Sequence, residues 1–159
     1  MRLSRADADR RLLRAAIKGF VLVHDSLVVH LCAQSAFRIC RDIVKSRFPD
    51  RDLLGGLLEP YLPQFLRSFS DLNNFLKHAD RGAEEIEVKG LHDRNASLIF
   101  ASCRYFEAAF GVACDEPSII LFQAYRHKCD PLSRPEAVAD LDPTLAELDA
   151  NQILTMLED

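Results

Sequence analysis

The sequence predicts an all-α fold, an up-and-down bundle of four to five helices. Apolar side chains recur every three or four residues through most of the chain, which is the spacing of amphipathic helices. The 159 residues include only six glycines and seven prolines, too few for the frequent turns of a β-sandwich or barrel. A content of 48% apolar and 28% charged residues is that of an ordinary globular domain with one core.

The first two helices begin at residues suited to capping. The first is expected from Ser4 to about Val23, because Ser4 is a suitable N-cap and acidic side chains in the early turns interact favourably with the helix dipole. Asp25 and Ser26 supply the cap for a second helix over residues 27–48, which the next proline ends. This second helix is apolar over about half its circumference, as expected of a central helix. Its apolar face comprises Val28, Val29, Cys32, Ala33, Ala36, Ile39, Cys40 and Ile43, and its narrow polar stripe Gln34, Arg38, Arg41 and Lys45.

A third and a fourth helix follow, separated by a segment treated as loop. The third is expected over residues 60–80, with prolines in its first turn and Gly82 at its end. Its apolar stripe comprises Leu62, Phe65, Leu66, Phe69, Leu72, Leu76 and Ala79. The fourth helix is expected to be capped by Asp93 or Asn95 and closed by Gly111.

The C-terminal part is expected to be organised differently from the rest. A fifth helix is predicted over residues 116–127, and a proline-containing linker over residues 129–135. A short acidic helix is expected over residues 142–157. The predicted organisation is therefore a bundle domain over residues 1–128, followed by a linker and an acidic helical extension over residues 129–159.

The net charge of −4 argues against a dedicated DNA-binding protein, but the charge is unevenly distributed. Residues 1–51 carry eleven Lys and Arg against five Asp and Glu, so the remainder holds nine against nineteen. Three interpretations stay open. The basic end binds nucleic acid, the acidic tail lies against the basic helix in the same chain or a partner, or both are solvated faces.

The cysteines and the N-terminal region indicate the cellular compartment of the protein. An odd number of cysteines without a CxxC pair favours buried, reduced thiols, as in cytoplasmic proteins. The five are Cys32, Cys40, Cys103, Cys114 and Cys129. The apolar run over residues 20–23 is interrupted by His24 before it reaches the length of a signal peptide or membrane helix. We therefore expect a cytoplasmic protein without membrane association.

The polar side chains around His78 are the strongest candidate for a functional site in the sequence. Four of them share one narrow sector of the third helix, opposite its apolar stripe: Arg67, Asp71, Asn74 and His78. A histidine beside amides, a lysine and carboxylates is well supplied for proton transfer near neutral pH. Candidate catalytic residues are His78, Asn73, Asn74 and Lys77, and candidate ligand-binding residues are Arg67, Asp71, Asp80 and His30. The simpler interpretation is a solvated face, with His78 near the helix C-terminus because imidazolium suits the dipole there.

The order of these residues carries a resemblance. Residues 74–80 resemble the segment Asn-Phe-Phe-Lys-His-Ala-Asp of a group of uncharacterised bacterial helical proteins. The likeness includes His30, which stands where that group has a histidine before a stretch of small residues, here residues 33–36. It spans about residues 15–111 and leaves out the acidic C-terminal third. It indicates positions of interest and implies no reaction.

The chain also has a more distant resemblance to the HEPN superfamily, helical bundles that often dimerise and often act as metal-independent ribonucleases. Their signature is an arginine followed by a polar residue, with a histidine four to six positions on. Counting back from His78, Asn73 occupies the arginine position and Asn74 follows it. An amide does not replace a guanidinium that neutralises a phosphate. The sequence therefore departs from the family at the arginine position, on which nuclease activity depends. The resemblance implies a homodimer that binds RNA or a nucleotide.

Two functions of different classes follow from these observations. The first is a non-catalytic interaction or regulatory module for a protein partner, favoured by the missing arginine, the charge polarity and the acidic tail. The second is an HEPN-like protein that binds a nucleotide or RNA at His78, including a ribonuclease or toxin-type component.

Metal binding is a further alternative. The five histidines form no ligand pair on one helix, so a metal site would have to be assembled across helices, for example from His30 and His78. No cofactor is predicted, because glycine-rich phosphate loops and a GxSxG elbow are both missing from the sequence.

Overall fold

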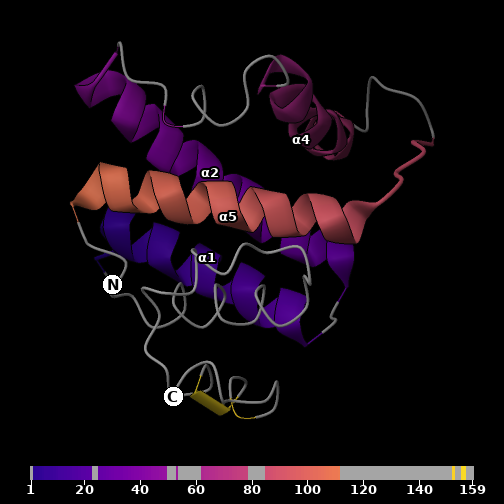
Figure 1. The fold of residues 1–159 in the computed structure, drawn as a ribbon, viewed down its shortest axis with the longest axis horizontal. Helices are drawn as coiled ribbons and strands as arrows, with labels where there is room; N and C mark the ends of the chain where they lie inside the picture. Colours follow the sequence, from indigo (N-terminus) through magenta and orange to yellow (C-terminus); the bar gives the residue numbers. More distant parts are fainter. Residues whose placement is uncertain are drawn as a thin grey trace, which may run out of the picture.

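The computed structural model describes residues 2–22, 25–49, 53, 62–78, 85–111, 152, 155 and 156. These residues form four helices and no strand, which confirms the predicted all-α class (Figure 1). The helices are α1 (Arg5–Val21), α2 (Ser26–Arg47), α4 (Leu62–Lys77) and α5 (Leu91–Phe110). The predicted fifth helix, the linker and most of the acidic extension lie outside the described residues. No helix in the described ranges is both long and apolar enough to span a membrane.

Local hydrogen bonds explain where α1 and α2 begin. The Ser4 hydroxyl accepts a hydrogen bond from the Asp7 backbone N–H over 3.1 Å, as expected of an N-cap. The Asp25 carboxylate accepts from the Leu27 N–H over 2.8 Å and does the same for the first turn of α2. Both predicted caps are confirmed.

The two ends of α5 are set by glycines. Gly111 has a φ of 66° and donates its N–H to the Glu107 carbonyl over 2.9 Å, so its predicted role at the C-terminus is confirmed. The predicted cap by Asp93 or Asn95 is wrong, because α5 begins at Leu91 after Gly90, whose φ is 60°. Asp93 lies in the first turn, and the Asn95 side chain is buried and bonded within the core.

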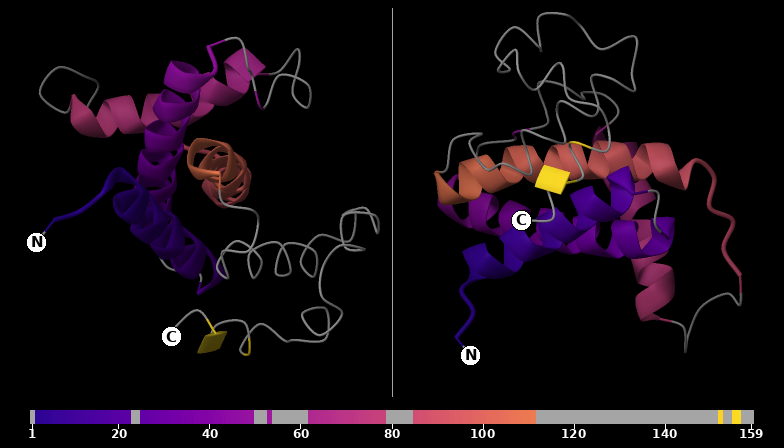
Figure 2. Two further views of the ribbon diagram at one scale, coloured as in Figure 1. Left: turned by 90° about the vertical axis from the view of Figure 1, so that its left-hand side faces the viewer. Right: turned by 90° about the horizontal axis from the view of Figure 1, so that it is seen from below.

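Three helices form the core, with α2 at its centre. Helix α2 contacts α1, α4 and α5, and α1 also packs on α5 (Figures 1 and 2). Helix α4 adds Phe69 to this core, and the largest fully buried side chains of the core are Phe37, Phe69, Phe106, Leu13, Ile17, Leu98 and Ile99. Phe37 and Tyr105 meet edge to face at 5.2 Å, and Arg47 Nη1 donates to the Ala109 carbonyl over 2.6 Å. Side chains of α2 and α5 thus interlock along their length.

Helix α4 crosses α2 instead of lying along it (Figure 2, left). Its contacts with α2 are few, and Phe69 and Leu72 are its buried apolar anchors, as predicted for its core stripe. Leu76 is only half-buried. The side chains of residues 62–66 and 68, and the expected end of the helix at residues 79 and 80, lie outside the described part.

The burial pattern of α2 corrects its predicted faces. Val28, placed on the apolar face by its spacing, is 56% exposed, and Gln34, placed on the polar stripe, is only 4% exposed. The reason is that α4 covers the side of α2 that carries Gln34, which the pattern of α2 alone does not specify. The predicted burial of free thiols is confirmed for Cys40 and Cys103, whereas Cys32 is half-buried.

Candidate functional site

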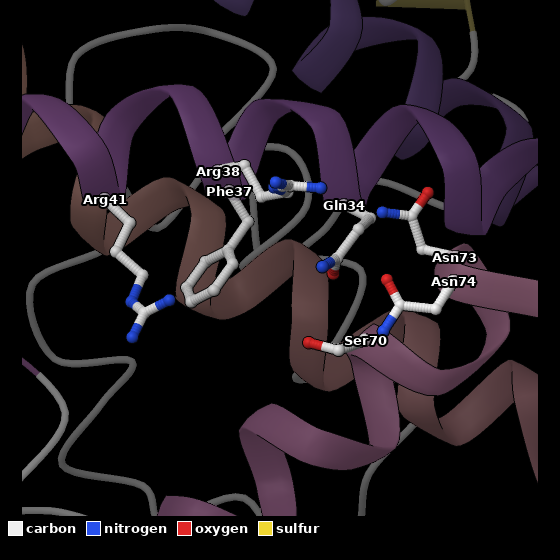
Figure 3. Close-up of a pocket in the computed structure, with 7 residues that line it drawn as sticks. All are labelled: Gln34, Phe37, Arg38, Arg41, Ser70, Asn73 and Asn74. Carbon is white, nitrogen blue, oxygen red and sulfur yellow. The ribbon is translucent and has the colours of Figure 1, made fainter. Parts of the chain in front are cut away.

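A groove of about 180 Å³ separates α2 from α4 (Figure 3). Its described lining is polar apart from one phenyl ring. The lining residues are Gln34, Phe37, Arg38 and Arg41 from α2, and Ser70, Asn73 and Asn74 from α4. Pockets that hold drug-sized ligands measure about 300–1,000 Å³. This groove therefore suits a small ligand or one end of a larger one.

Helical spacing brings these side chains to the same place. On α2 they occur at i, i+3, i+4 and i+7, and on α4 at i, i+3 and i+4, so each set projects from one face of its helix. Phe37 is buried and is the one apolar residue in the described lining. The Arg41 guanidinium lies over the Phe37 ring, 6.0 Å from its centroid, which holds this cation at one end of the groove (Figure 3).

The groove is positively charged. Arg38 and Arg41 are its two charged side chains, and no carboxylate is present among its described lining residues. The ion pairs within the described part of the chain lie elsewhere, on α1, on α5 and near Lys89. Two guanidinium groups beside amides are suited to binding an anion, because both groups donate hydrogen bonds.

Gln34 is the least satisfied side chain of the groove. It is 4% exposed, and its Oε1 atom is buried without a hydrogen-bond partner. Figure 3 shows its amide pointing into the space between α2 and α4. A buried acceptor without a partner costs about 1–3 kcal/mol. This atom therefore marks a place where a bound donor would be favoured.

His30 fixes α4 against the core next to this groove. Its Nδ1 lies 3.0 Å from Asn95 Oδ1 and its Nε2 lies 3.3 Å from the Phe69 carbonyl oxygen. Asn95 in turn donates from Nδ2 to the Ser26 carbonyl over 2.7 Å. One fully buried side chain thus links α2, α4 and α5.

The structure separates the residues that the sequence grouped as a site. Asn73 and Asn74 line the groove, and Asn73 is 7% exposed. The other predicted residues described on α4 or directly after it are exposed and do not line it: Arg67, Asp71, Lys77 and His78. Asp80 lies outside the described residues.

The two histidines proposed to converge occupy different environments. His30 is fully buried, whereas His78 is exposed just after α4, where its backbone N–H donates to the Asn74 carbonyl over 3.0 Å. No contact joins the two side chains in the described structure. His30 is therefore a residue that positions the groove wall.

Sequence reasoning did not assign Gln34, Arg38, Arg41 and Ser70 to a site. The sequence does carry a signal for the first three, since they belong to the narrow polar stripe of an otherwise apolar helix. A polar stripe on a central helix is unusual when that helix is covered on several sides. The serine and two asparagines at i, i+3 and i+4 on the third helix were the matching signal.

Known proteins offer no guide to this site. Comparisons with protein-family models, curated proteins and solved structures find no match to the chain. In the described ranges no three His, Cys, Asp or Glu side chains are grouped to hold a metal ion. Function must therefore be inferred from the groove itself.

The buried thiols are unsuited to nucleophilic chemistry. Burial raises the pKa of both Cys40 and Cys103, which disfavours the reactive thiolate form. Cys40 Sγ donates a hydrogen bond to Asp9 Oδ2 over 2.7 Å in the core between α1 and α2. Burial also raises the pKa of Asp9 to about 6.

Proposed function

We propose that this protein is a non-catalytic binding module whose groove between α2 and α4 holds the anionic end of a small polar ligand. The observation that carries the proposal is the composition of the groove. Two guanidinium groups, of Arg38 and Arg41, face it with amides and a hydroxyl, and no described lining residue is acidic. Charge-assisted hydrogen bonds from guanidinium groups are among the strongest in proteins.

The same composition supports binding rather than catalysis. General acid–base chemistry uses His, Asp, Glu, Lys, Tyr or Cys, and nucleophilic chemistry needs an activated side chain next to a base. None of these residue types lines the described groove. Among the described lining residues, Ser70 carries the one hydroxyl and none is a base.

Titration calorimetry with inorganic phosphate, sulfate and acetate tests the proposal. The wild-type chain is expected to bind phosphate saturably, and the double variant Arg38→Gln/Arg41→Gln to bind it about tenfold or more weakly, since each charged hydrogen bond contributes about 1.5–3 kcal/mol. Arg11→Gln is the matched control, because Arg11 is exposed on α1 away from the groove. Equal binding by the double variant, or no saturable binding of any anion by wild type, would contradict the proposal.

A second candidate is an HEPN-like protein that binds a nucleotide or RNA with the help of His78. One observation favours it: Asn74 lines the groove, and His78 follows one helical turn later on the same face. RNA cleavage by wild type and its loss in His78→Ala would establish this function. If neither wild type nor His78→Ala cleaves RNA, the result supports the first proposal. Light scattering tests the homodimer that belongs to this candidate, against a monomer mass of 18.0 kDa.

A further inference from the structure

Gln34 indicates what the ligand carries besides its negative charge. Nearly all buried acceptors in folded proteins have a hydrogen-bond partner. Gln34 Oε1 is enclosed by protein atoms and has none, although the side chain lines a groove that is large enough for a ligand, so a turn of the amide brings this acceptor to the groove (Figure 3). An acceptor in this position calls for a ligand atom that donates a hydrogen bond.

The neighbouring charges restrict what that donor is. Arg38 follows Gln34 by one helical turn, and Arg41 follows by two. An ammonium group on the ligand would be repelled by these two cations. A neutral hydroxyl donates one hydrogen bond without this repulsion and has lone pairs for the amide donors of the groove.

The anionic group is best matched by a phosphate ester. A phosphate monoester carries a charge of about −1.5 to −2 near pH 7, which balances two guanidinium groups better than one carboxylate does. Its three terminal oxygens also accept more hydrogen bonds than the two of a carboxylate. The amide groups of Asn73 and Asn74 supply further donors on the opposite wall.

On the basis of the proposed function, we infer that the groove selects a small phosphate monoester with a hydroxyl group near the phosphate. Arg38 and Arg41 hold the phosphate, and Gln34 Oε1 accepts the hydrogen bond of the hydroxyl. Gln34 is then the residue that distinguishes a hydroxylated ester from an alkyl ester of the same length. This is the chemistry of a sugar phosphate or a polyol phosphate.

The test compares glycerol 1-phosphate with propyl phosphate, which has the same carbon chain without hydroxyl groups. Wild type is expected to bind glycerol 1-phosphate about tenfold more tightly, because only this ester satisfies the buried acceptor. Gln34→Met keeps the length of the side chain and removes the acceptor, so it is expected to bind both esters with equal affinity. Its thermal unfolding, compared with wild type, shows that the variant is folded.

The outcomes separate this inference from the proposed function. If wild type binds both esters equally, or if Gln34→Met keeps the preference, the role of Gln34 is overturned while anion binding stands. If wild type binds neither ester nor inorganic phosphate, the proposed function fails and the inference fails with it. A preference that is lost in Gln34→Met and retained in Arg11→Gln supports both.

Discussion

His30 Nε2 lies 3.3 Å from the carbonyl oxygen of Phe69, and this contact lies beside the groove, because Phe69 directly precedes Ser70 in the α4 wall. Gln34 follows His30 by four residues on α2, and Asn73 follows Phe69 by four residues on α4. Since α4 makes few other contacts with α2, this polar contact and the buried Phe69 side chain set the separation of the groove walls. The buried histidine therefore acts on the groove through the position of α4.

Replacing His30 is expected to reduce both stability and anion binding. His30→Ala leaves Asn95 Oδ1 without its partner and opens a cavity in the core, which together cost about 3 kcal/mol of unfolding free energy. Urea denaturation measures this loss, and calorimetry with inorganic phosphate measures the weakened binding. His78→Ala is the control, since an exposed substitution changes stability by about 0.5 kcal/mol or less. Equal stability of the two variants would contradict the role assigned to His30.

Local signals in the sequence were sufficient to predict most of the helix ends. Ser4, Asp25 and Gly111 act through hydrogen bonds or backbone angles within one turn, so their residue types alone identify them. The start of α5 was missed because Asn95 is a good cap by type. Its side chain instead contacts His30, 65 residues away in the chain, and no local pattern specifies such a contact.

The groove was harder to predict because it also depends on contacts between residues that are far apart in the chain. The sequence shows the polar stripe of α2 and the candidate site residues of α4, but it does not show that Gln34, Arg38 and Arg41 face α4. Their meeting depends on the angle at which α4 crosses α2, which is set by packing of distant residues. Of the described residues grouped around His78, only Asn73 and Asn74 line the groove against α2. The periodicity of one helix does not show which neighbour covers it.

The C-terminal glycine of α5 should tolerate asparagine better than alanine. Gly111 has a φ of 66°, and a Cβ added there would meet no atom within 4 Å, so the cost of substitution comes from the backbone angle alone. Gly111→Ala is expected to lose about 1 kcal/mol of unfolding free energy, and Gly111→Asn less, since asparagine adopts left-handed angles more readily. Thermal unfolding of the two variants measures this order, and the reverse order would contradict it.

Arg47 is expected to stabilise the contact between the ends of α2 and α5. Its Nη1 donates to the Ala109 carbonyl over 2.6 Å, near the negative end of the α5 dipole. Arg47→Met keeps most of the aliphatic stem and removes the donor, with an expected loss of about 1 kcal/mol. Lys45→Met removes a charge two residues earlier on an exposed position of α2. Equal urea midpoints for these two variants would show that the hydrogen bond contributes nothing.

Asp9 is expected to make stability fall as the pH rises. It is fully buried, its Oδ1 atom has no partner, and burial raises its pKa from the ordinary value of 3.8 to about 6. The folded state therefore binds the proton more tightly than the unfolded state does. The stabilisation is complete below about pH 4 and is lost as the pH rises through about 6. Two pKa units correspond to about 3 kcal/mol.

Asp9→Asn measures this effect because asparagine does not ionise and still offers an oxygen to the Cys40 thiol. The unfolding free energy of the variant relative to wild type is expected to increase by about 2.4 kcal/mol between pH 4 and pH 7.5. Asp7→Asn is the control of opposite sign, because the Ser4 hydroxyl lowers the pKa of the exposed Asp7 carboxyl group. The contribution of Asp7 to stability is therefore lost as the pH falls. A difference between Asp9→Asn and wild type that stays constant over this range would contradict the raised pKa of Asp9 in the folded protein.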